Sequence, residues 1–508
     1  MEIKLGPSKS LIYTCPEKLI LPLCVEFTYT NSSIAYQVFS HKQNRQKIIS
    51  RLVATTAMDS TEAGAIWRDQ LEELSVGLKV SLIKKTQDGL VIFPTGLLNK
   101  VLDFFSKNGF SRDHLRQSCV TDYRVRPKQT NGFPIEGKPA VLRPYQEKAV
   151  SELLIHGQGT IVSGTGSGKT MILQEVIHIL GLKTVMIVPT VSILNQTIAR
   201  FEKYFGSRLV GKLGDGKKVI DKKITVACAA SAALTTADMW EGVDVVITDE
   251  AHHTPAKTLE TIMYNVFPKA FYRFGATATC FRNDGADLAI EAAVFPPLFN
   301  YDVEDGIKEG FLAVPSTIVY HVPFNSYRDY SGKLMTYCYK YHVFRNEKLN
   351  RIIAQQINSY LAEGKQVLVL VREKEHGFRL QSMVPGSAFI HQGPRPTKLG
   401  PAPEPVYKKS TAAVNDFNSG KLRCMIGTSI IGEGTDIIPV NVLFNLMGGK
   451  SKLDLMQNIG RGLRRTETKS EVLLIDYIHA THDLLKKHSL VRYKFYQSLG
   501  KVELKQLT

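Results

Sequence analysis

The stretch from residue 160 to residue 181, TIVSGTGSGKTMILQEVIHILG, decides the fold. An apolar, β-branched run ends at Ser163, a glycine-rich turn follows, and apolar residues then recur with a helical period up to Gly181. A strand, a turn and a helix in this order place successive backbone N–H groups and the positive end of a helix around one anion. The stretch therefore predicts a phosphate-binding loop within a parallel α/β sheet.

The expected roles in this loop follow from the chemistry of a nucleoside triphosphate. The ammonium group of Lys169 would neutralise the β- and γ-phosphates, and the hydroxyl group of Thr170 would bind Mg²⁺. Ser163 stands where such loops usually begin with glycine, and we expect this small residue to be tolerated. ATP and Mg²⁺ are thus the expected cofactors. The residues expected to surround the phosphates are Gly164, Thr165, Gly166, Ser167 and Gly168.

An acid–imidazole cluster, TDEAHH at residues 248–253, ends the apolar run VDVVIT. Asp249 comes 80 residues after Lys169 (249 − 169 = 80), which leaves room for two or three βα units. Open α/β sheets bind their ligands at the carboxyl ends of strands. We therefore expect Asp249 to hold Mg²⁺, commonly through water, and Glu250 to orient and deprotonate the attacking water.

The two histidines of the cluster raise the alternative of a zinc site. A common zinc-binding pattern is H-E-x-x-H on a helix. Asp249, His252 and His253 do not have that spacing, and they follow a strand rather than lie on a helix. We therefore disfavour zinc. His252 is expected to sense the γ-phosphate or to couple hydrolysis to motion, and His253 to be a structural or surface residue.

Length, charge and cysteine usage limit the class of protein. A chain of 508 residues is too long for one ordinary core, so two to four domains are expected. The formal net charge of +17 favours a polyanionic partner, most simply nucleic acid. Seven cysteines without a CxxC pair favour reduced thiols in a cytoplasmic protein, and the apolar runs are too short to span a membrane.

Three blocks follow from the strand and helix patterns. Residues 1–130 carry no nucleotide motif, and their clearest helix is TGLLNKVLDFFSKNG. The basic, proline-containing segment 123–141 is expected to be a linker. Buried-strand patterns alternate with helix-length segments in residues 131–305, and the alternation restarts in residues 306–508. The expected α/β lobes contain the runs GTIVSG, TVMIVP, KITVAC and VDVVIT, then QVLVLV, SAFIHQ, RCMIGT, NVLFNL and EVLLID.

The second lobe carries a basic helix pattern, LMQNIGRGLRR. It places Gln457, Arg461 and Arg464 on one helix, with the two arginines one turn apart and therefore on a shared face. Two guanidinium groups directed at a γ-phosphate would stabilise the charge that builds during hydrolysis. We expect these three residues to take part in catalysis.

At this point the chain resembles the superfamily 2 helicases, over residues 138–480. The resemblance implies two RecA-like lobes, with LRPYQEKAV as the adenine-recognition motif, in which Gln146 reads the base beside Arg143. It implies coupling roles for His252 and for Thr277 and Thr279 in GATATCFRNDG. Nucleotide contacts are implied for Gly434 and Asp436 of IGTSIIGEGTDIIPV. Nucleic-acid contacts are implied for Thr190, Gln196, Arg282, Arg372 and Thr428.

Within the superfamily, the chain is similar to phage branch-migration helicases of the UvsW type and more distantly to XPB-like and restriction-translocase motors. A further match is GLVIFPTGLLNKVLDFFSKNGF in the first block. This resemblance implies an ATP-driven DNA helicase or translocase that remodels Holliday junctions and forks and removes R-loops in phage recombination, repair and replication. Residues 1–130 would then bind the duplex or junction. The departures are Asn283 and the proline-rich insertion at 393–409.

Two alternatives stay open at the level of sequence. The motor motifs do not separate DNA from RNA, so an RNA helicase of the DExH type is one rival. The motor subunit of a restriction system is another, although no further domain-sized block is available to hold a nuclease. In every case the expected partner is nucleic acid, duplex or branched, or an RNA–DNA hybrid, bound through phosphates without sequence preference by a monomer or a transient oligomer.

Overall fold

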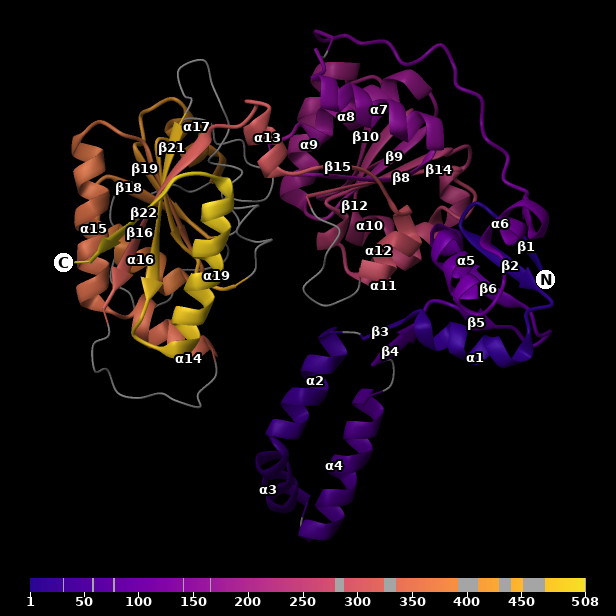
Figure 1. Ribbon diagram of the computed structural model, residues 1–508, viewed down its shortest axis with the longest axis horizontal. Coiled ribbons are helices and arrows are strands. Elements are labelled where there is room, and N and C mark those ends of the chain that lie inside the picture. Colours follow the sequence, from indigo (N-terminus) through magenta and orange to yellow (C-terminus); the bar gives the residue numbers. More distant parts are fainter. Residues whose placement is uncertain are drawn as a thin grey trace. The chain divides into compact units, whose positions relative to one another are not determined.

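The computed structural model divides into two compact units, residues 1–162 with 170–300 and residues 163–169 with 301–508 (Figure 1). It describes residues 1–507 apart from 31, 57–58, 76–77, 140, 165, 279–286, 324–334, 392–409, 429–439 and 451–470. Among the described residues, no helix is both long and apolar enough to cross a membrane.

The first lobe is built on an eight-stranded sheet in the order β11-β10-β12-β9-β13-β14-β8-β15. Its strands from β10 to β8 in this order are parallel, and every residue of β9, β12 and β13 is buried. The apolar runs read from the sequence form these strands, which confirms the expected parallel sheet. The strands are β8 (Gln158–Ser163), β9 (Thr184–Val188), β10 (Val210–Gly214), β11 (Lys217–Val219), β12 (Ile224–Cys228), β13 (Val245–Asp249), β14 (Tyr272–Thr277) and β15 (Pro297–Tyr301).

Helices cover both faces of this sheet (Figure 1). The first of them begins with Pro144 at its amino end, where a missing N–H does no harm, and ends at Gly157, whose φ of 72° suits glycine. The helices are α7 (Pro144–His156), α8 (Lys169–Leu180), α9 (Val191–Phe205), α10 (Ala229–Ala232), α11 (Ala256–Thr261) and α12 (Asp287–Val294).

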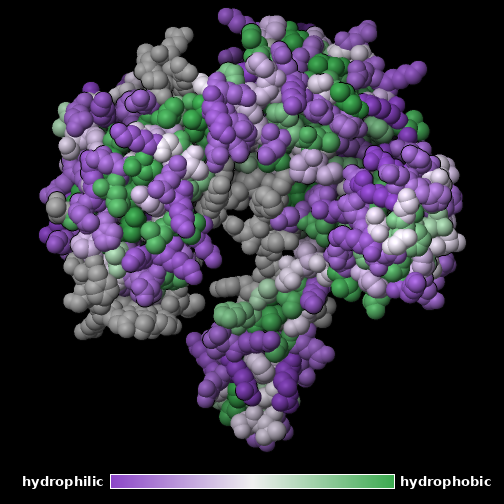
Figure 2. Space-filling model, viewed as in Figure 1, coloured by the Kyte–Doolittle hydropathy of each residue, from purple (hydrophilic) through white to green (hydrophobic). Residues whose placement is uncertain are grey.

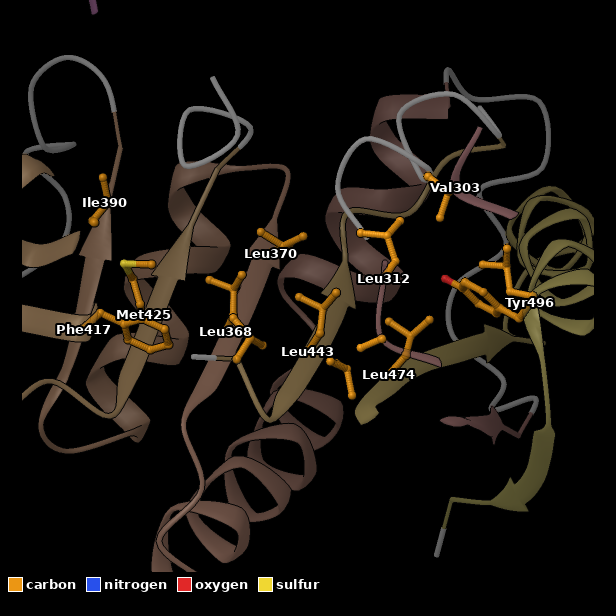
Figure 3. Close-up of a cluster of buried hydrophobic side chains, with 14 of the residues drawn as sticks. Val303, Leu312, Leu368, Leu370, Ile390, Phe417, Met425, Leu443, Leu474 and Tyr496 are labelled. Atoms are coloured by element: carbon orange, nitrogen blue, oxygen red, sulfur yellow. The ribbon is translucent and has the colours of Figure 1, made fainter. Parts of the chain in front are cut away.

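The second lobe holds a seven-stranded parallel sheet in the order β18-β19-β17-β20-β21-β16-β22. Figure 3 shows one face of its core, where Leu368, Leu443 and Leu474 lie on neighbouring strands. The strands are β16 (Val314–Val322), β17 (Val367–Val371), β18 (Ser387–Ile390), β19 (Cys424–Gly427), β20 (Val442–Leu446), β21 (Glu471–His479) and β22 (Val502–Gln506). The helices are α13 (Val303–Lys308), α14 (Met335–Tyr339), α15 (Glu347–Ala362), α16 (Lys374–Met383), α17 (Ser410–Asn418) and α19 (Asp483–Leu499).

A small α+β domain precedes the lobes, as expected. Its five-stranded sheet has the order β5-β6-β2-β1-β7, and α5 (Leu98–Lys107) packs the expected apolar face, including Leu102 and Phe105, into the core. The other elements are β1 (Glu2–Leu5), β2 (Lys9–Tyr13), α1 (Glu17–Glu26), β3 (Thr28–Thr30), β4 (Lys79–Ser81), β5 (Lys84–Lys85), β6 (Val91–Pro94), α6 (Arg112–His114) and β7 (Val120–Asp122).

Three further helices in this domain escaped the sequence analysis. They are α2 (Ser32–Gln43), α3 (Arg45–Thr56) and α4 (Ser60–Ser75), and they lie together between the paired strands β3 and β4 (Figure 1). We call them the helical insertion. Much of their surface is hydrophilic in Figure 2. Helices that are polar over much of their surface have a weak hydrophobic periodicity, which is the main signal by which a sequence reveals a helix.

The segment expected to be a linker, residues 123–141, is hydrogen-bonded to the first lobe. Arg126 donates to the carbonyl oxygens of Leu154 and Ile155 at the end of α7. The backbone N–H of Thr130 donates to Leu180 O at the end of α8, at 3.1 Å. These bonds use carbonyl groups that a helix leaves unpaired at its carboxyl end, which explains why a proline-rich segment is held there.

The small domain also shares a buried interface with the first lobe. Ala292 of α12 belongs to the hydrophobic core of the small domain, and Lys100 Nζ lies 3.3 Å from Glu291 Oε2. Gly96 approaches α12 so closely that a Cβ atom there would lie 2.3 Å from Glu291 O. Burial raises the pKa of Glu291, and the nearby Lys100 opposes that rise.

Candidate active site

The phosphate loop connects β8 to α8 as the sequence predicts. Gly166 has a φ of 89° and Gly168 a φ of 82°, values that glycine adopts without strain. The Lys169 side chain is buried, and its Nζ donates to Ser163 O at 3.1 Å. The ammonium group is therefore held at the end of β8, within the loop that would surround a phosphate.

Asp249 is the last residue of β13, and only 7% of its surface is exposed. Strands β13 and β8 belong to the same parallel sheet with β14 between them, so both strands end at the same edge. The Thr170 hydroxyl and the Asp249 carboxylate are hard oxygen ligands of the kind that Mg²⁺ prefers. These residues thus fit the metal that the loop implies.

Glu250 adopts an unusual backbone conformation directly after this strand. Its φ of 46° and ψ of 48° lie in the left-handed region, which is strained for a residue other than glycine. Its backbone N–H donates to Asp249 Oδ1 at 3.0 Å. The turn is thus fixed at the carboxyl end of β13, beside Asp249.

His252 connects this turn with the next strand. Its Nδ1 lies 2.6 Å from Thr277 Oγ1, at the end of β14, and 3.5 Å from Glu250 Oε2. The His253 ring packs over the His252 ring at 4.0 Å between centroids, and His253 itself is exposed. His252, rather than its neighbour, is thus in a position to sense both the expected base and β14.

The structure places the other expected residues of the first lobe at the ends of helices. Gln146 is buried, and its Oε1 accepts from the backbone N–H of Arg143 at 2.9 Å, which forms the first turn of α7. Thr190 caps α9 through a hydrogen bond from Ile193 N. Gln196 lies on the same helix and is partly exposed.

In the second lobe, Arg372 follows β17 and lies over the Tyr339 ring, 5.5 Å from its centroid. Thr428 follows β19 and is buried. The remaining expected positions lie outside the described residues, as does the proline-rich insertion. They are Thr165, Thr279, Arg282, Gly434, Asp436, Gln457, Arg461 and Arg464.

Sequence analysis missed a buried ion pair in the second lobe. Arg492 of α19 forms two hydrogen bonds with the Asp476 carboxylate, at 2.8 and 2.9 Å, and its Nη1 donates to Gly449 O at 2.9 Å. Asn445 and Tyr496 also donate to Asp476. The pair thus holds the backbone at Gly449, in the loop that follows β20.

Comparison with known proteins gives the family. Residues 140–282 match the family model "Type III restriction enzyme, res subunit", and residues 347–466 match "Helicase conserved C-terminal domain". The two models follow each other in the order of the two lobes. The chain belongs to the superfamily 2 helicases. It is therefore an ATP-dependent helicase enzyme, and nucleic acid is its partner.

Proteins similar to this helicase include one curated relative and two solved structures. The DNA 3'-5' translocase XPB2 of Sulfurisphaera tokodaii is 26% identical over 373 residues, which cover 68% of this chain and 83% of the relative. The ATP-dependent type ISP restriction-modification enzyme LlaBIII, bound to DNA, has a TM-score of 0.50 and 13% identity, over 80% of this chain and 36% of that one. T4 UvsW aligns over 100% of this chain and 99% of its own at 16% identity, with a TM-score of only 0.43.

Proposed function

We propose that this helicase is an ATP-driven motor that remodels branched DNA, such as Holliday junctions and forks, and also removes R-loops. The observation that carries the proposal is the helical insertion. Its α2–α3 part, residues 31–58, contains Lys42, Arg45, Lys47 and Arg51 and no acidic residue, whereas residues 59–78 carry five acidic residues and Arg68, so that the basic groups gather on one part of an insertion with no net charge (5 − 5 = 0). A motor that only tracked one strand would not need a second basic surface in a separate domain, whereas a branched substrate offers a second arm to hold.

An aromatic group lies within this basic surface. The Trp67 ring of α4 stacks on the His41 ring at 5.7 Å between centroids, with the planes 5° apart. The Arg45 guanidinium lies 5.2 Å from the Trp67 ring centroid. Basic groups around an aromatic ring suit both a phosphate backbone and an unstacked base at a branch point.

The expected catalytic residues supply hydrolysis. The Lys169 ammonium group would stabilise the β- and γ-phosphates, and the Glu250 carboxylate would take a proton from the attacking water. Mg²⁺, when bound at Thr170 and Asp249, supplies further positive charge to the phosphates. Gln457, Arg461 and Arg464 of the second lobe would stabilise the charge on the γ-phosphate.

Movement along DNA would come from contacts with phosphates. Backbone N–H groups, hydroxyl groups and Arg or Lys side chains of each lobe would bind one strand, and such contacts position a protein without reading sequence. Binding should therefore be independent of sequence and should weaken steeply with salt. XPB2, the archaeal relative, is named as a translocase on DNA, which supports DNA over RNA as the substrate.

The helical insertion can be removed cleanly to test this proposal. Thr30 of β3 pairs with Lys79 of β4, so Asn-Gly in place of residues 31–78 would close the two strands with a two-residue turn. We expect this variant to keep ATPase activity that single-stranded DNA stimulates, and to lose conversion of a synthetic four-way junction. Unchanged junction conversion would remove any role for the insertion.

A second variant keeps the insertion and removes only three of its positive charges. Lys42, Arg45 and Lys47 are exposed, so K42A/R45A/K47A should keep the fold and reproduce the loss on four-way junctions. A forked duplex, an R-loop and a structured RNA are measured beside the junction. Stronger stimulation by RNA would favour the RNA-helicase alternative, and translocation without strand separation on any substrate would favour a restriction-type motor.

A further inference from the structure

The hairpin formed by β10 and β11, residues 210–219, lies at one edge of the first lobe's sheet. Because β10 runs parallel to β12, with Leu213 paired to Ala227, its turn emerges at the carboxyl edge of the sheet. The same edge holds the start of α9 after Thr190 and the start of α10 after Cys228. The hairpin turn thus lies beside the two helix starts that follow β9 and β12.

The backbone of this turn has an unusual conformation and packs closely against its neighbours. Three consecutive residues have positive φ, Gly214 at 130°, Asp215 at 55° and Gly216 at 74°. A Cβ atom at Gly214 would lie 2.9 Å from Leu194 Cδ2 and 3.0 Å from Cys228 Cβ. A residue such as Asp215 in the left-handed region costs about 1–3 kcal/mol, so the surrounding structure must hold the turn in this form.

Three side chains fasten the turn to α9. Lys212 Nζ donates to Asn195 Oδ1 at 2.6 Å and to Asp215 Oδ2 at 3.1 Å, and Asn195 Nδ2 donates to Asp215 Oδ2 at 3.2 Å. The hydrogen bond from Lys212 lowers the pKa of Asp215, and Asn195 adds to the effect. Asp215 therefore stays ionised and offsets the charge of Lys212.

Two more lysines follow the turn. Lys217 and Lys218 begin β11 and are both exposed, and with Lys212 and Asp215 they leave the hairpin with a net charge of +2. Asn195, to which the hairpin is fastened, lies five residues past Thr190 on α9, which is about 7.5 Å along a helix. Adjacent strand residues point to opposite faces, and Lys217 pairs with Gly214, whose face meets Leu194 of α9, whereas Lys218 pairs with Leu213. A strand bound at the start of α9 would therefore pass Lys217 within the reach of its side chain.

We propose that the β10–β11 hairpin is a phosphate-binding element of the first lobe, in which Lys217 contacts the backbone of the nucleic-acid strand next to the start of α9 and Lys218 adds positive charge at the hairpin turn. The contacts would be independent of sequence, because lysine acts as a point charge on phosphate. This inference rests on the proposed function, since it needs a nucleic-acid strand at the first lobe. It names contacts that no motif of the sequence indicates.

A matched control lies at the other end of the same strands. Arg208 and Lys223 are also exposed, but they precede β10 and β12 and therefore lie at the amino edge of the sheet. The double variants K217A/K218A and R208A/K223A remove the same charge from the full-length protein at opposite edges. K217R/K218R keeps the charge at the carboxyl edge.

The test measures binding of a labelled single-stranded oligonucleotide by fluorescence anisotropy at several KCl concentrations. Each lost phosphate contact lowers the slope of log K against log salt by about 0.7, so K217A/K218A should lose at least about 0.7, the share of Lys217. R208A/K223A and K217R/K218R should keep the wild-type slope. Thermal unfolding of each variant checks that the fold is kept.

Failure of this inference and failure of the proposed function have different signatures. If K217A/K218A and R208A/K223A show the same slope while the wild-type protein binds and is stimulated, the hairpin inference is overturned alone. A partner other than nucleic acid, such as an acidic protein, would give that same result. If no nucleic acid stimulates the wild-type ATPase, the proposed function itself fails.

Discussion

His252 Nδ1 lies 2.6 Å from Thr277 Oγ1, which joins the turn after β13 to the end of β14. A net hydrogen bond is worth about 0.5–1.5 kcal/mol, enough to bias two arrangements of neighbouring strand ends. We expect His252→Ala and Thr277→Val each to reduce unwinding far more than ATP hydrolysis. Parallel measurements of phosphate release and strand separation test this. In the double variant the two effects should not add, and full additivity would show that the pair acts separately.

Lys169→Ala should lower the rate of ATP hydrolysis by about 10²–10³-fold, because one preorganised positive group at the phosphates is lost. The side chain is buried and bound to Ser163 O, so Lys169→Met, which keeps its length, controls for packing. Phosphate release under saturating single-stranded DNA is the measurement. Wild-type turnover in both variants would contradict the assignment of the phosphate loop.

Glu250→Gln should bind ATP and DNA but hydrolyse ATP about 10²–10⁴-fold more slowly, because a general base is lost while the shape is kept. Glu250 holds its position through its backbone conformation, so the amide should leave the turn intact. Filter binding of nucleotide together with single-turnover hydrolysis separates the two steps. A variant that failed to bind nucleotide would disprove the role of base.

The buried pair of Asp476 and Arg492 predicts a dependence of stability on pH. Burial alone would raise the pKa of Asp476, but the Arg492 guanidinium and its hydrogen bonds hold the pKa below its ordinary value. The stabilisation is therefore present above the unfolded pKa of about 3.9 and is lost as pH falls through the lower folded pKa. Asp476→Asn should destabilise the second lobe by about 3–5 kcal/mol at neutral pH.

Hydrogen exchange of the β21 amides, followed from neutral to acidic pH, measures this effect. The difference between wild type and Asp476→Asn should shrink as the solution becomes more acidic. The control is Glu347→Gln, which removes an exposed ion pair with Arg351 at 3.6 Å and should change stability by at most about 0.5 kcal/mol. A constant difference at all pH values would contradict the shifted pKa.

Gly96→Ala should weaken the attachment of the small domain to the first lobe, because a Cβ atom there would lie 2.3 Å from Glu291 O. Gly64→Ala is the matched control, since no atom lies within 4 Å of that position on α4. Alanine there should stabilise the helix by about 0.5–1 kcal/mol. Limited proteolysis between the small domain and the first lobe, faster only in Gly96→Ala, measures the effect.

The parallel sheets and the expected carboxyl-edge site were predictable because their signals are local. The apolar run before Asp249 and the glycines before Lys169 lie within a few residues of the functional side chains that they position. The pairing of Asp476 with Arg492 was not predictable, because it depends on how α19 packs against β21. Helices α2–α4 were missed because their faces are mostly polar. The attachment of the linker was missed because its hydrogen bonds are accepted by backbone carbonyl groups, which leave no trace in side-chain patterns.

The hydrogen bonds that fix Arg126 and Thr130 to the ends of α7 and α8 leave little slack between the small domain and the first lobe. With a flexible linker, the first lobe could move during each ATPase cycle without moving the small domain by the same amount. Here, a duplex arm bound by the helical insertion would turn through the same angle as the first lobe. Viscous drag on a duplex arm increases with its length, so each ATPase cycle would have to do more work on a longer arm. Long arms should therefore slow translocation.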